Sequence, residues 1–386
     1  MTYAQGRVFN DADSHIMELP NFLKSYADPA VRERMPLIPV PTVGAMAVLT
    51  EEASNAGRHS DAMVAELVAM GDTLIAGPKG YAALGAFNAD ERVQALDMLG
   101  FDKQLVFASY SEFMAFGADL PVEMRYAAAR AHNRGMAEFC ARDRRFYGVG
   151  LLPLDDIAAS LVELDHILAL GLKAIWVAHK PSGGRSPGHT DLDPIWARMA
   201  AAGVPFLLHV AAVRIQIDRG WMNNGRPLPK DWLGAGESVR GKDMTSLHHP
   251  AETFIGCMVL DGALERHPTL RGGIIELGAG WVPQMLNRLD WVADIWKKSE
   301  PDLAALKRRP SEQILQQLAF TPFPYENVGE LIRQSDERLY MFSSDYPHIE
   351  GGRAPLARFE TGLLGVAESA RSCFYADNFA RLFEMA

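Results

Sequence analysis

Short apolar runs alternate with longer amphipathic stretches over most of the 386 residues, and this alternation restricts the fold more than any other feature of the chain. The pattern predicts strands at 8–15, 104–108, 147–152, 172–178, 204–210, 271–277 and 339–344, with a weaker strand at 316–320. It predicts helices at 122–142, 156–170, 194–202, 251–266 and 279–296. Strands separated by helices build βαβ units with a parallel sheet. Eight strands favour a (β/α)8 TIM barrel over a doubly wound open sheet, because no Gly-rich phosphate loop follows the first strand.

Two stretches are too long for an ordinary connection between a strand and its helix. Residues 27–90, rich in Ala, Gly and Pro, lie between the first two predicted strands, and residues 211–250 lie between the fifth strand and its helix. In a barrel, insertions after strands lie on the catalytic face. We therefore predict one barrel domain over residues 1–386, in which both insertions form the substrate pocket or an oligomer contact. For residues 27–90, a mobile loop at the surface is an alternative of equal weight to a pocket wall or an oligomer contact.

Charge and composition narrow the class of partner. The formal net charge is -10 and the sequence pI is about 5.6, which argues against nucleic acids and anionic membranes because phosphate binding needs a dense positive surface. No apolar run approaches the roughly 20 residues of a membrane span, and the first residues lack the apolar core of a signal peptide. Three scattered cysteines indicate neither a disulfide framework nor a zinc finger. We expect a cytoplasmic homo-oligomer, a dimer, that acts on a small molecule.

The first predicted strand carries three ionisable side chains at every second position: Asp11, Asp13 and His15. Side chains alternate between the two faces of a strand, so all three would point the same way. Two carboxylates and an imidazole that converge form a ligand set for a divalent cation. The alternative is a solvated strand end, but such an end has no need of a histidine.

Four other predicted strands also end in ionisable residues. They are His179 after strand four, His209 after strand five, Glu276 after strand six and Asp345 after the last strand. The catalytic groups of a barrel lie at the carboxyl ends of its strands, so a shared metal centre explains this pattern better than stability does. Alone, His209 would be interpreted as a hydrogen-bonded core histidine and Asp345 as a turn residue. Since Glu276 alternates with Ile275, it should point into the barrel, as a ligand, a partner of a ligand or a general base.

Two further histidines, His248 and His249, lie just before a predicted helix with Pro in its first turn. Either one is placed to enter the pocket as an acid or a base. The alternative is that both only pack at the helix entry.

Three residues are expected to contact the substrate: His179, His348 and Arg353. His348 follows the last strand, close to its terminal aspartate. Arg353, like Arg130 and Arg134, is a candidate clamp for a carboxylate because guanidinium binds carboxylate through two hydrogen bonds. Position in the sequence does not choose among the three arginines.

Together these motifs resemble the amidohydrolase superfamily. The matching segments are Asp-Ala-Asp-Ser-His at 11–15, Leu-Leu-His at 207–209, Pro-Ala-Glu-Thr at 250–253, Gly-Ala-Gly-Trp-Val-Pro at 278–283 and Ser-Ser-Asp-Tyr-Pro-His at 343–348. They are most similar to the amidohydrolase-related branch that contains aminocarboxymuconate-semialdehyde decarboxylase and γ-resorcylate decarboxylase. The resemblance implies a metal-dependent (β/α)8 barrel in which Asp13, His15, His209 and Asp345 hold the cation. It also implies that Asp345 handles the proton of a water molecule bound there.

Two departures from the family pattern affect the expected chemistry. The decarboxylases resemble one another in a catalytic histidine at the end of strand six, where this chain has Glu276. Binuclear relatives carry a carbamylated lysine from strand four, but here His179 takes the inward position and Lys180 should face away. One metal ion is therefore expected, although Glu276 and Asp11 supply enough carboxylate for a second.

The leading hypothesis is a metal-dependent hydrolase that directs an activated water molecule at an ester, thioester, amide or C–C bond of a small carbonyl substrate. Its predicted catalytic residues are Asp345, His248, His249 and Glu276. The alternative is a metal-dependent, non-oxidative decarboxylase of an aromatic or unsaturated carboxylic acid. A third hypothesis is a barrel that only binds a ligand. Zinc is the first choice of cation for these ligands, with manganese or iron as alternatives.

Overall fold

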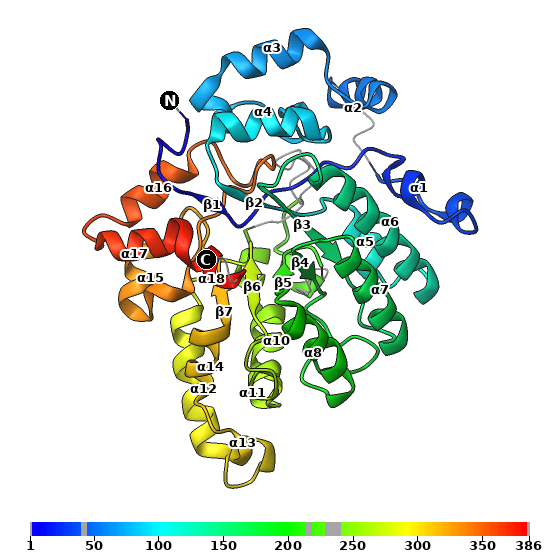
Figure 1. Cartoon of the computed structure of the whole chain (residues 1–386). Coiled ribbons are helices and arrows are strands. Elements are labelled where there is room, and N and C mark those ends of the chain that lie inside the picture. Colours follow the sequence, from blue (N-terminus) through cyan, green and yellow to red (C-terminus); the bar gives the residue numbers. More distant parts are fainter. Residues whose placement is uncertain (1, 40–44, 213–217, 228–240, 384–386) are drawn as a thin grey trace.

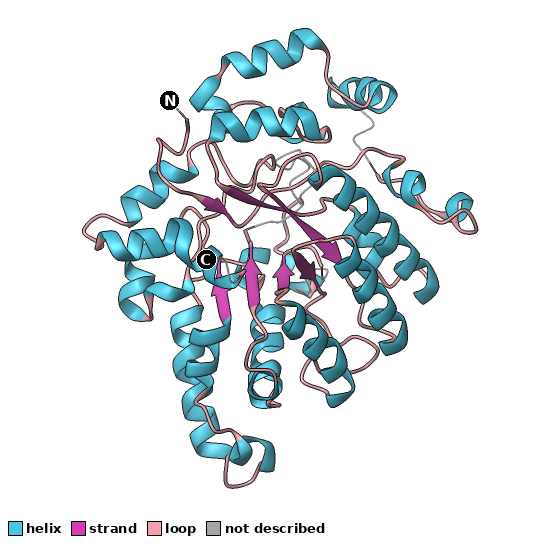
Figure 2. Cartoon of the chain, in the orientation of Figure 1, coloured by secondary structure: helices cyan, strands magenta, loops and turns pink. Residues whose placement is uncertain are grey.

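The computed structural model describes residues 2–39, 45–212, 218–227 and 241–383. Its centre is a parallel sheet of seven strands in the order β1 to β7, so each strand pairs with the next one along the chain (Figures 1 and 2). The strands are β1 (Asn10–Asp11), β2 (Lys103–Val106), β3 (Phe146–Leu151), β4 (Ala174–Trp176), β5 (Phe206–His209), β6 (Gly272–Ile275) and β7 (Leu318–Phe320). This order is that of a βα barrel, in which each strand returns through a helical connection.

An extended segment closes the sheet where the last strand is predicted. Tyr340 bridges Phe320 at the end of β7, and the amide of Met341 donates to the Phe320 carbonyl at 2.9 Å. On its other side the segment meets the first strand, since Ala12 N donates to Phe342 O at 3.0 Å. The fold is therefore the predicted (β/α)8 type, with a closing segment that forms single bridges instead of a continuous ladder.

Helices cover the outside of the sheet and fill the connections between strands (Figure 2). They are α1 (Phe22–Tyr26), α2 (Ala45–Ala56), α3 (Asp61–Ala69), α4 (Ala89–Leu99), α5 (Ser111–Phe116), α6 (Val122–Cys140), α7 (Ile157–Ala169), α8 (Asp193–Ala202), α9 (Arg219–Met222), α10 (His249–Leu260), α11 (Ala263–Arg266), α12 (Val282–Trp296), α13 (Pro301–Ala305), α14 (Pro310–Gln317), α15 (Val328–Gln334), α16 (Pro355–Gly362), α17 (Glu368–Ser372) and α18 (Asn378–Leu382). The helix predicted at 251–266 is interrupted at Gly262, whose φ is 74°, and becomes α10 and α11. None of the helices described has the length and apolar composition needed to traverse a bilayer.

The connection between β1 and β2 is mostly helical. It contains α2, α3 and α4, which gather on one side of the molecule beyond the first two strands (Figure 1). Ser60 caps α3 by accepting from the Met63 amide, and Asn88 caps α4 by accepting from the Glu91 amide. The sequence pattern missed all three of these helices, because they lie within or next to the segment interpreted as an insertion.

The second predicted insertion, 211–250, is described only in part, because 213–217 and 228–240 lie outside the described residues. Its described part includes α9, where Trp221 is 73% exposed. Whether either insertion forms a pocket wall or an oligomer contact stays a prediction.

Two apolar layers hold the barrel together. The inner layer takes residues from β2 to β7 at alternate positions, among them Leu105, Val149, Trp176, Leu207 and Ile275. Their chain neighbours, such as Val106, Ile175 and Ile274, pack outward with the helices. The period of two therefore places one face of each strand inside the barrel, and the same face leads to the side chains at its carboxyl end.

Candidate metal centre

The ionisable side chains of the first, fifth and last strands converge at the carboxyl end of the barrel. Asp13 and His15 follow β1, His209 ends β5, and Asp345 follows the closing segment. All four are buried, with at most 6% exposure. Backbone contacts hold these segments side by side, since Asp345 N donates to Asp13 O at 2.9 Å and His15 bridges Phe107 beyond β2. The four residues predicted as ligands therefore share one region.

One group of potential ligand atoms is centred on Asp13. Its Oδ1 lies 3.2 Å from His15 Nε2 and 3.3 Å from His209 Nε2. Glu276 completes the group, since its Oε2 lies 3.5 Å from His209 Nε2. One ligand atom from each of these four residues lies within 4.8 Å of the others. Imidazole and carboxylate donors at this spacing fit a shared divalent cation.

A second group shares His15. Asp345 Oδ1 lies 3.6 Å from His15 Nε2 and 3.2 Å from His348 Nδ1. The rings of His15 and His348 stack with centroids 3.9 Å apart. The structure thus places two more residues with the four predicted ligands: Glu276, for which a ligand role was one of three alternatives, and His348, which was expected to contact the substrate.

Backbone carbonyls orient two of the imidazoles. His15 Nδ1 lies 2.7 Å from Ala108 O and His209 Nδ1 lies 3.0 Å from Val210 O, and a carbonyl can only accept. Each Nδ1 therefore donates a proton to its carbonyl. His15 Nε2 is left with a lone pair toward the neighbouring carboxylates, whereas His209 Nε2 lies within hydrogen-bond distance of Asp13 Oδ1, at 3.3 Å. Lone pairs of nitrogen and oxygen that face one another need a positive charge between them. A divalent cation supplies that charge, so the residues present fit a metal ion.

Several of these atoms have no hydrogen-bond partner. Among the described residues, none donates a hydrogen bond to His15 Nε2 or to either carboxylate oxygen of Asp345, although all three atoms are buried. A buried polar atom without a partner costs on the order of 1–3 kcal/mol, so native sites normally supply one. This observation supports the metal interpretation independently of the spacing.

Burial sets the protonation of the cluster. It lowers the pKa of His15 to about 4, with a contribution from His348, and it raises the pKa of Asp345 to about 7, with a contribution from Asp13. Burial would also raise the pKa of Asp13, but the neighbouring imidazoles of His209 and His15 hold it below its usual range. The neutral imidazole of His15 and the ionised carboxylate of Asp13 are the forms in which these groups bind metals.

Glu276 reaches the cluster by a route that alternation does not predict. Ile275 packs in the inner layer and Ile274 in the outer one, so strict alternation would turn Glu276 outward. The backbone instead adopts a left-handed conformation at Glu276, with φ of 52°, and its amide donates to Thr321 Oγ1 at 2.9 Å. Glu276 does face the centre, but alternation with Ile275 is the wrong reason for it.

The other predicted site residues are not members of these two groups. His179 follows β4 and is buried, and burial lowers its pKa to about 3. His248 is partly buried and stacks on Trp281 with centroids 5.4 Å apart, whereas His249 is exposed. Arg353 is exposed as well. Catalytic or substrate-binding roles for these four residues stay predictions.

Two ionisable side chains near Asp345, Lys79 and Glu350, were not predicted as site residues. Lys79 Nζ and both carboxylate oxygens of Glu350 are buried without a hydrogen-bond partner among the described residues. Gly80 N donates to Pro347 O at 2.9 Å, which fastens the Lys79 segment to the loop after Asp345. Burial lowers the pKa of Lys79 to about 8, and the charges of Asp345 and Glu350 limit that shift. Nothing in the pattern of the first insertion signalled this lysine.

Asp11, which alternates with Asp13 in the sequence, is engaged in hydrogen bonds within the barrel wall. Its carboxylate accepts from Gln104 Nε2 at 2.8 Å, from Ser344 N at 2.8 Å and from Ser344 Oγ at 2.6 Å. These contacts tie β1 to β2 on one side and to the closing segment on the other. The carboxylate considered for a second metal therefore has a structural partner at each oxygen.

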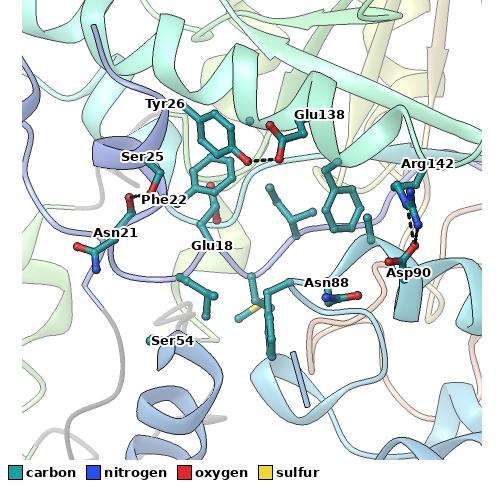
Figure 3. A pocket seen from close by; sticks show the side chains of 17 residues that line it. Glu18, Asn21, Phe22, Ser25, Tyr26, Ser54, Asn88, Asp90, Glu138 and Arg142 are labelled. Carbon is teal, nitrogen blue, oxygen red and sulfur yellow. Dashed lines mark hydrogen bonds and ion pairs between the residues drawn. The ribbon is translucent and has the colours of Figure 1, made fainter. Parts of the chain in front are cut away.

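A separate cavity of about 390 Å³ lies between the loop after β1, α4 and α6 (Figure 3). Aromatic side chains form much of its wall, and its polar groups pair with one another. Tyr26 OH donates to Glu138 Oε1 at 3.0 Å, and Arg142 forms an ion pair with Asp90. No candidate metal ligand lines this cavity, so it is distinct from the predicted reaction site.

Fold and site together define a class of protein: βα barrels that carry potential metal ligands at the carboxyl ends of their strands. Residues 49–385 match the amidohydrolase family, and the chain belongs to that family. The family predicted from the sequence motifs is thereby confirmed. No curated protein matches the sequence at a significant level.

Solved structures of similar fold cover nearly the whole chain. An amidohydrolase from Mycobacterium avium subsp. paratuberculosis K-10 is 21% identical with a TM-score of 0.69, over 98% of this chain and 99% of that one. The 5-carboxyvanillate decarboxylase of Sphingomonas paucimobilis is 19% identical with a TM-score of 0.62 over the same shares. A dihydroxybenzoic acid decarboxylase from Polaromonas sp. JS666, with bound manganese and the inhibitor 2-nitroresorcinol, is 17% identical with a TM-score of 0.64, over 98% and 97%. At these identities the likeness shows the fold.

Proposed function

We propose that this protein is a metal-dependent, non-oxidative decarboxylase of a small aromatic or unsaturated carboxylic acid. The observation that carries the proposal is Lys79, a buried ammonium without a hydrogen-bond partner beside Asp345. An ammonium in this position attracts a carboxylate, while the neighbouring ligand groups can hold a cation. Two of the structural neighbours are decarboxylases, which supports the same class. The order of the two hypotheses drawn from the sequence is thereby reversed.

Each residue has a defined part in the proposed reaction. Asp13, His15 and His209 hold the cation, which when bound withdraws electron density from a substrate oxygen. Lys79 orients the carboxyl group of the substrate. Loss of carbon dioxide leaves an electron pair on carbon, which must take up a proton. Asp345 is our candidate for the donor, because its carboxyl group is buried at the ligand groups, 3.6 Å from His15 Nε2, where it can reach a substrate held there.

The identity of the metal is part of the proposal. Imidazole and carboxylate donors suit zinc, manganese and iron. Zinc is our first choice from the ligand types, whereas the Polaromonas neighbour carries manganese. The activity should therefore be tested with each of the two metals separately.

Release of carbon dioxide tests the proposed function directly. The purified protein, loaded with Mn2+ or Zn2+, is incubated with 2,6-dihydroxybenzoate, 5-carboxyvanillate and related hydroxylated benzoates. We expect one carbon dioxide molecule for each acid molecule consumed with at least one member of this panel. No release from any acid, together with hydrolysis of a test ester or amide, would support the hydrolase instead.

The hydrolase is a second candidate because of strand six. Where the decarboxylases of the family resemble one another in a histidine, this chain has Glu276. Its Oε2 lies 3.5 Å from His209 Nε2, within the first ligand group, where a carboxylate suits the role of a base toward water. Glu276→Gln should then abolish hydrolysis of the test ester or amide, whereas a decarboxylase that does not use this base should still release carbon dioxide.

Lys79→Met should separate binding of the substrate carboxylate from binding of the cation. Methionine keeps an apolar stem but carries no charge, so we expect the KM for an accepted acid to rise by about 10–100-fold, the value of a hydrogen bond to a charged group. Elemental analysis should find an unchanged metal content. Lys180→Met is the matched control, because Lys180 Nζ donates to the Phe116 carbonyl and should leave KM within about twofold. An unchanged KM in Lys79→Met would remove Lys79 from the proposal.

A further inference from the structure

Ser109 connects the loop after the first strand to His348. Its Oγ lies 2.7 Å from Ile16 O and 2.7 Å from His348 Nε2. Its amide donates to Glu18 Oε2 at 2.9 Å, so the backbone of this serine is held as well. Ser109 follows β2 at the same end of the barrel as the ligand groups. Its place directly after the predicted strand at 104–108 is the sequence signal for this residue.

The hydroxyl also lies 3.5 Å from Met17 Sδ, which is only a weak acceptor, so its two short contacts assign the proton on His348. A serine has one hydroxyl proton, and the Ile16 carbonyl can only accept. When the hydroxyl donates to Ile16 O, its oxygen is left to accept from His348, so His348 Nε2 carries a proton. His348 Nδ1 is buried and makes no hydrogen bond to any described residue, so no acceptor holds a second proton there and the ring is neutral. A neutral imidazole has a single N–H, which leaves a lone pair on Nδ1.

That lone pair faces Asp345 and His15, the other two members of the second ligand group. His348 Nδ1 lies 3.2 Å from Asp345 Oδ1 without a hydrogen bond between them, and both atoms are buried without a partner among the described residues. His15 Nε2 lies 3.6 Å from the same oxygen. The rings of His15 and His348 stack at 21° from parallel, so the two imidazoles approach Asp345 side by side. Two imidazole nitrogens therefore lie within 3.6 Å of one carboxylate oxygen, and none of the three atoms has a hydrogen-bond partner among the described residues.

We infer that His348 binds the cation through Nδ1, as a third imidazole, and that Ser109 is the positioning residue that holds its ring. This inference rests on the proposed metal centre and adds a ligand to the four that the resemblance to the family implies. The competing arrangement has the proton on Nδ1, with His348 donating to Asp345 and Ser109 donating to Nε2. It would leave Ile16 O without the hydroxyl proton at 2.7 Å, and no hydrogen bond joins Nδ1 to Asp345.

Ser109→Ala tests the positioning role without any substrate. The variant removes the acceptor for His348 Nε2–H, and we expect the affinity of the purified metal-free chain for Zn2+ to fall by about 10–100-fold, the usual effect of losing the partner of a ligand. Competition with a chelator measures this affinity. Ser109→Thr keeps the hydroxyl, so its Zn2+ affinity should stay within about threefold of that of the wild type. Ser160→Ala is the control, since Ser160 is another buried serine that donates to a carbonyl, Pro153 O at 2.8 Å, and should leave the affinity unchanged.

A double-mutant cycle shows whether Ser109 acts through His348. His348→Ala should weaken Zn2+ binding at least as much as Ser109→Ala, and the double variant should bind no more weakly than His348→Ala alone. Additive losses would mean that Ser109 affects the site by another route, and would overturn its positioning role. An unchanged affinity in folded His348→Ala would overturn His348 as a ligand, while leaving the proposed function intact.

Nitrogen-15 chemical shifts of histidine-labelled, metal-free protein give a second readout. We expect a protonated Nε2 and an unprotonated Nδ1 for His348 in wild type and in Ser109→Thr, and a mixture of the two tautomers in Ser109→Ala. A protonated Nδ1 in wild type would overturn the inference even if the protein binds metal. If the wild type binds neither Zn2+ nor Mn2+, the proposed function and the ligand role fail together, and the shifts then decide the role of Ser109 alone.

Discussion

His15→Ala should leave a folded protein without its cation and without activity. His15 Nε2 is the atom common to both ligand groups, 3.2 Å from Asp13 Oδ1 and 3.6 Å from Asp345 Oδ1. Alanine removes this atom, so the metal affinity should fall by more than the roughly 10–100-fold that follows loss of a ligand's partner. Elemental analysis after dialysis should find less than about a tenth of the wild-type metal. Carbon dioxide release from an accepted acid should be lost with it.

The control for this variant is another buried histidine. His132 in α6 is fully buried, its Nε2 lies 3.2 Å from Val149 O, and it belongs to neither ligand group. His132→Ala should lower the free energy of unfolding by about 1–3 kcal/mol because it leaves a cavity, but it should keep the full metal content. Full metal occupancy in folded His15→Ala would contradict the assignment of His15 as a ligand.

The barrel and the ligands at its strand ends could be predicted because side chains alternate between the two faces of a strand, with a period of two residues. Inner-layer pairs such as Val149 and Leu151 show that period directly, and His209 lies two positions beyond the inner residue Leu207, so the direction of its side chain follows from the strand. The lengths of the strands were predicted less well. The first strand, expected at 8–15, forms a ladder only at Asn10–Asp11, because beyond it the chain makes single bridges to the neighbouring segments.

The rest of the site depends on loops, for which a periodic pattern carries no information. Lys79 is placed by the attachment of its segment to the loop after Asp345, a contact between segments far apart in the sequence. Ser109 meets His348 in the same way, over a separation of 239 residues. Glu276 turns toward the centre through a left-handed backbone, which the sequence does not indicate for a glutamate. The position of Lys79, the contact between Ser109 and His348 and the backbone turn at Glu276 therefore needed three-dimensional coordinates, although the sequence already placed Glu276 at the site.

Asp11→Ala should cause the largest loss of stability of any variant considered. The carboxylate is fully buried and accepts hydrogen bonds from Gln104 Nε2, Ser344 N and Ser344 Oγ at 2.8, 2.8 and 2.6 Å. Alanine leaves these donors buried without an acceptor, which costs about 1–3 kcal/mol for each donor. Small shifts of the surrounding atoms let some donors find new partners, so the total loss of stability is smaller than the sum of these costs. We expect the free energy of unfolding to fall by about 3–5 kcal/mol. Urea denaturation of the metal-free protein measures it, because bound metal would add its own stabilisation.

Asp11→Asn distinguishes a structural carboxylate from a metal ligand. Asparagine keeps one acceptor oxygen but turns an amide N–H toward the same donors, so stability should fall by about 2 kcal/mol while Zn2+ affinity stays within about tenfold of wild type. Asp165→Ala is the control, since Asp165 is 61% exposed in an ion pair with Arg198 and should cost less than about 1 kcal/mol. Equal stability of Asp11→Ala and Asp165→Ala would show that closure of the barrel does not depend on this network. Loss of metal at full stability in Asp11→Asn would instead make Asp11 a ligand, because only a carboxylate that faces the cation could produce that result.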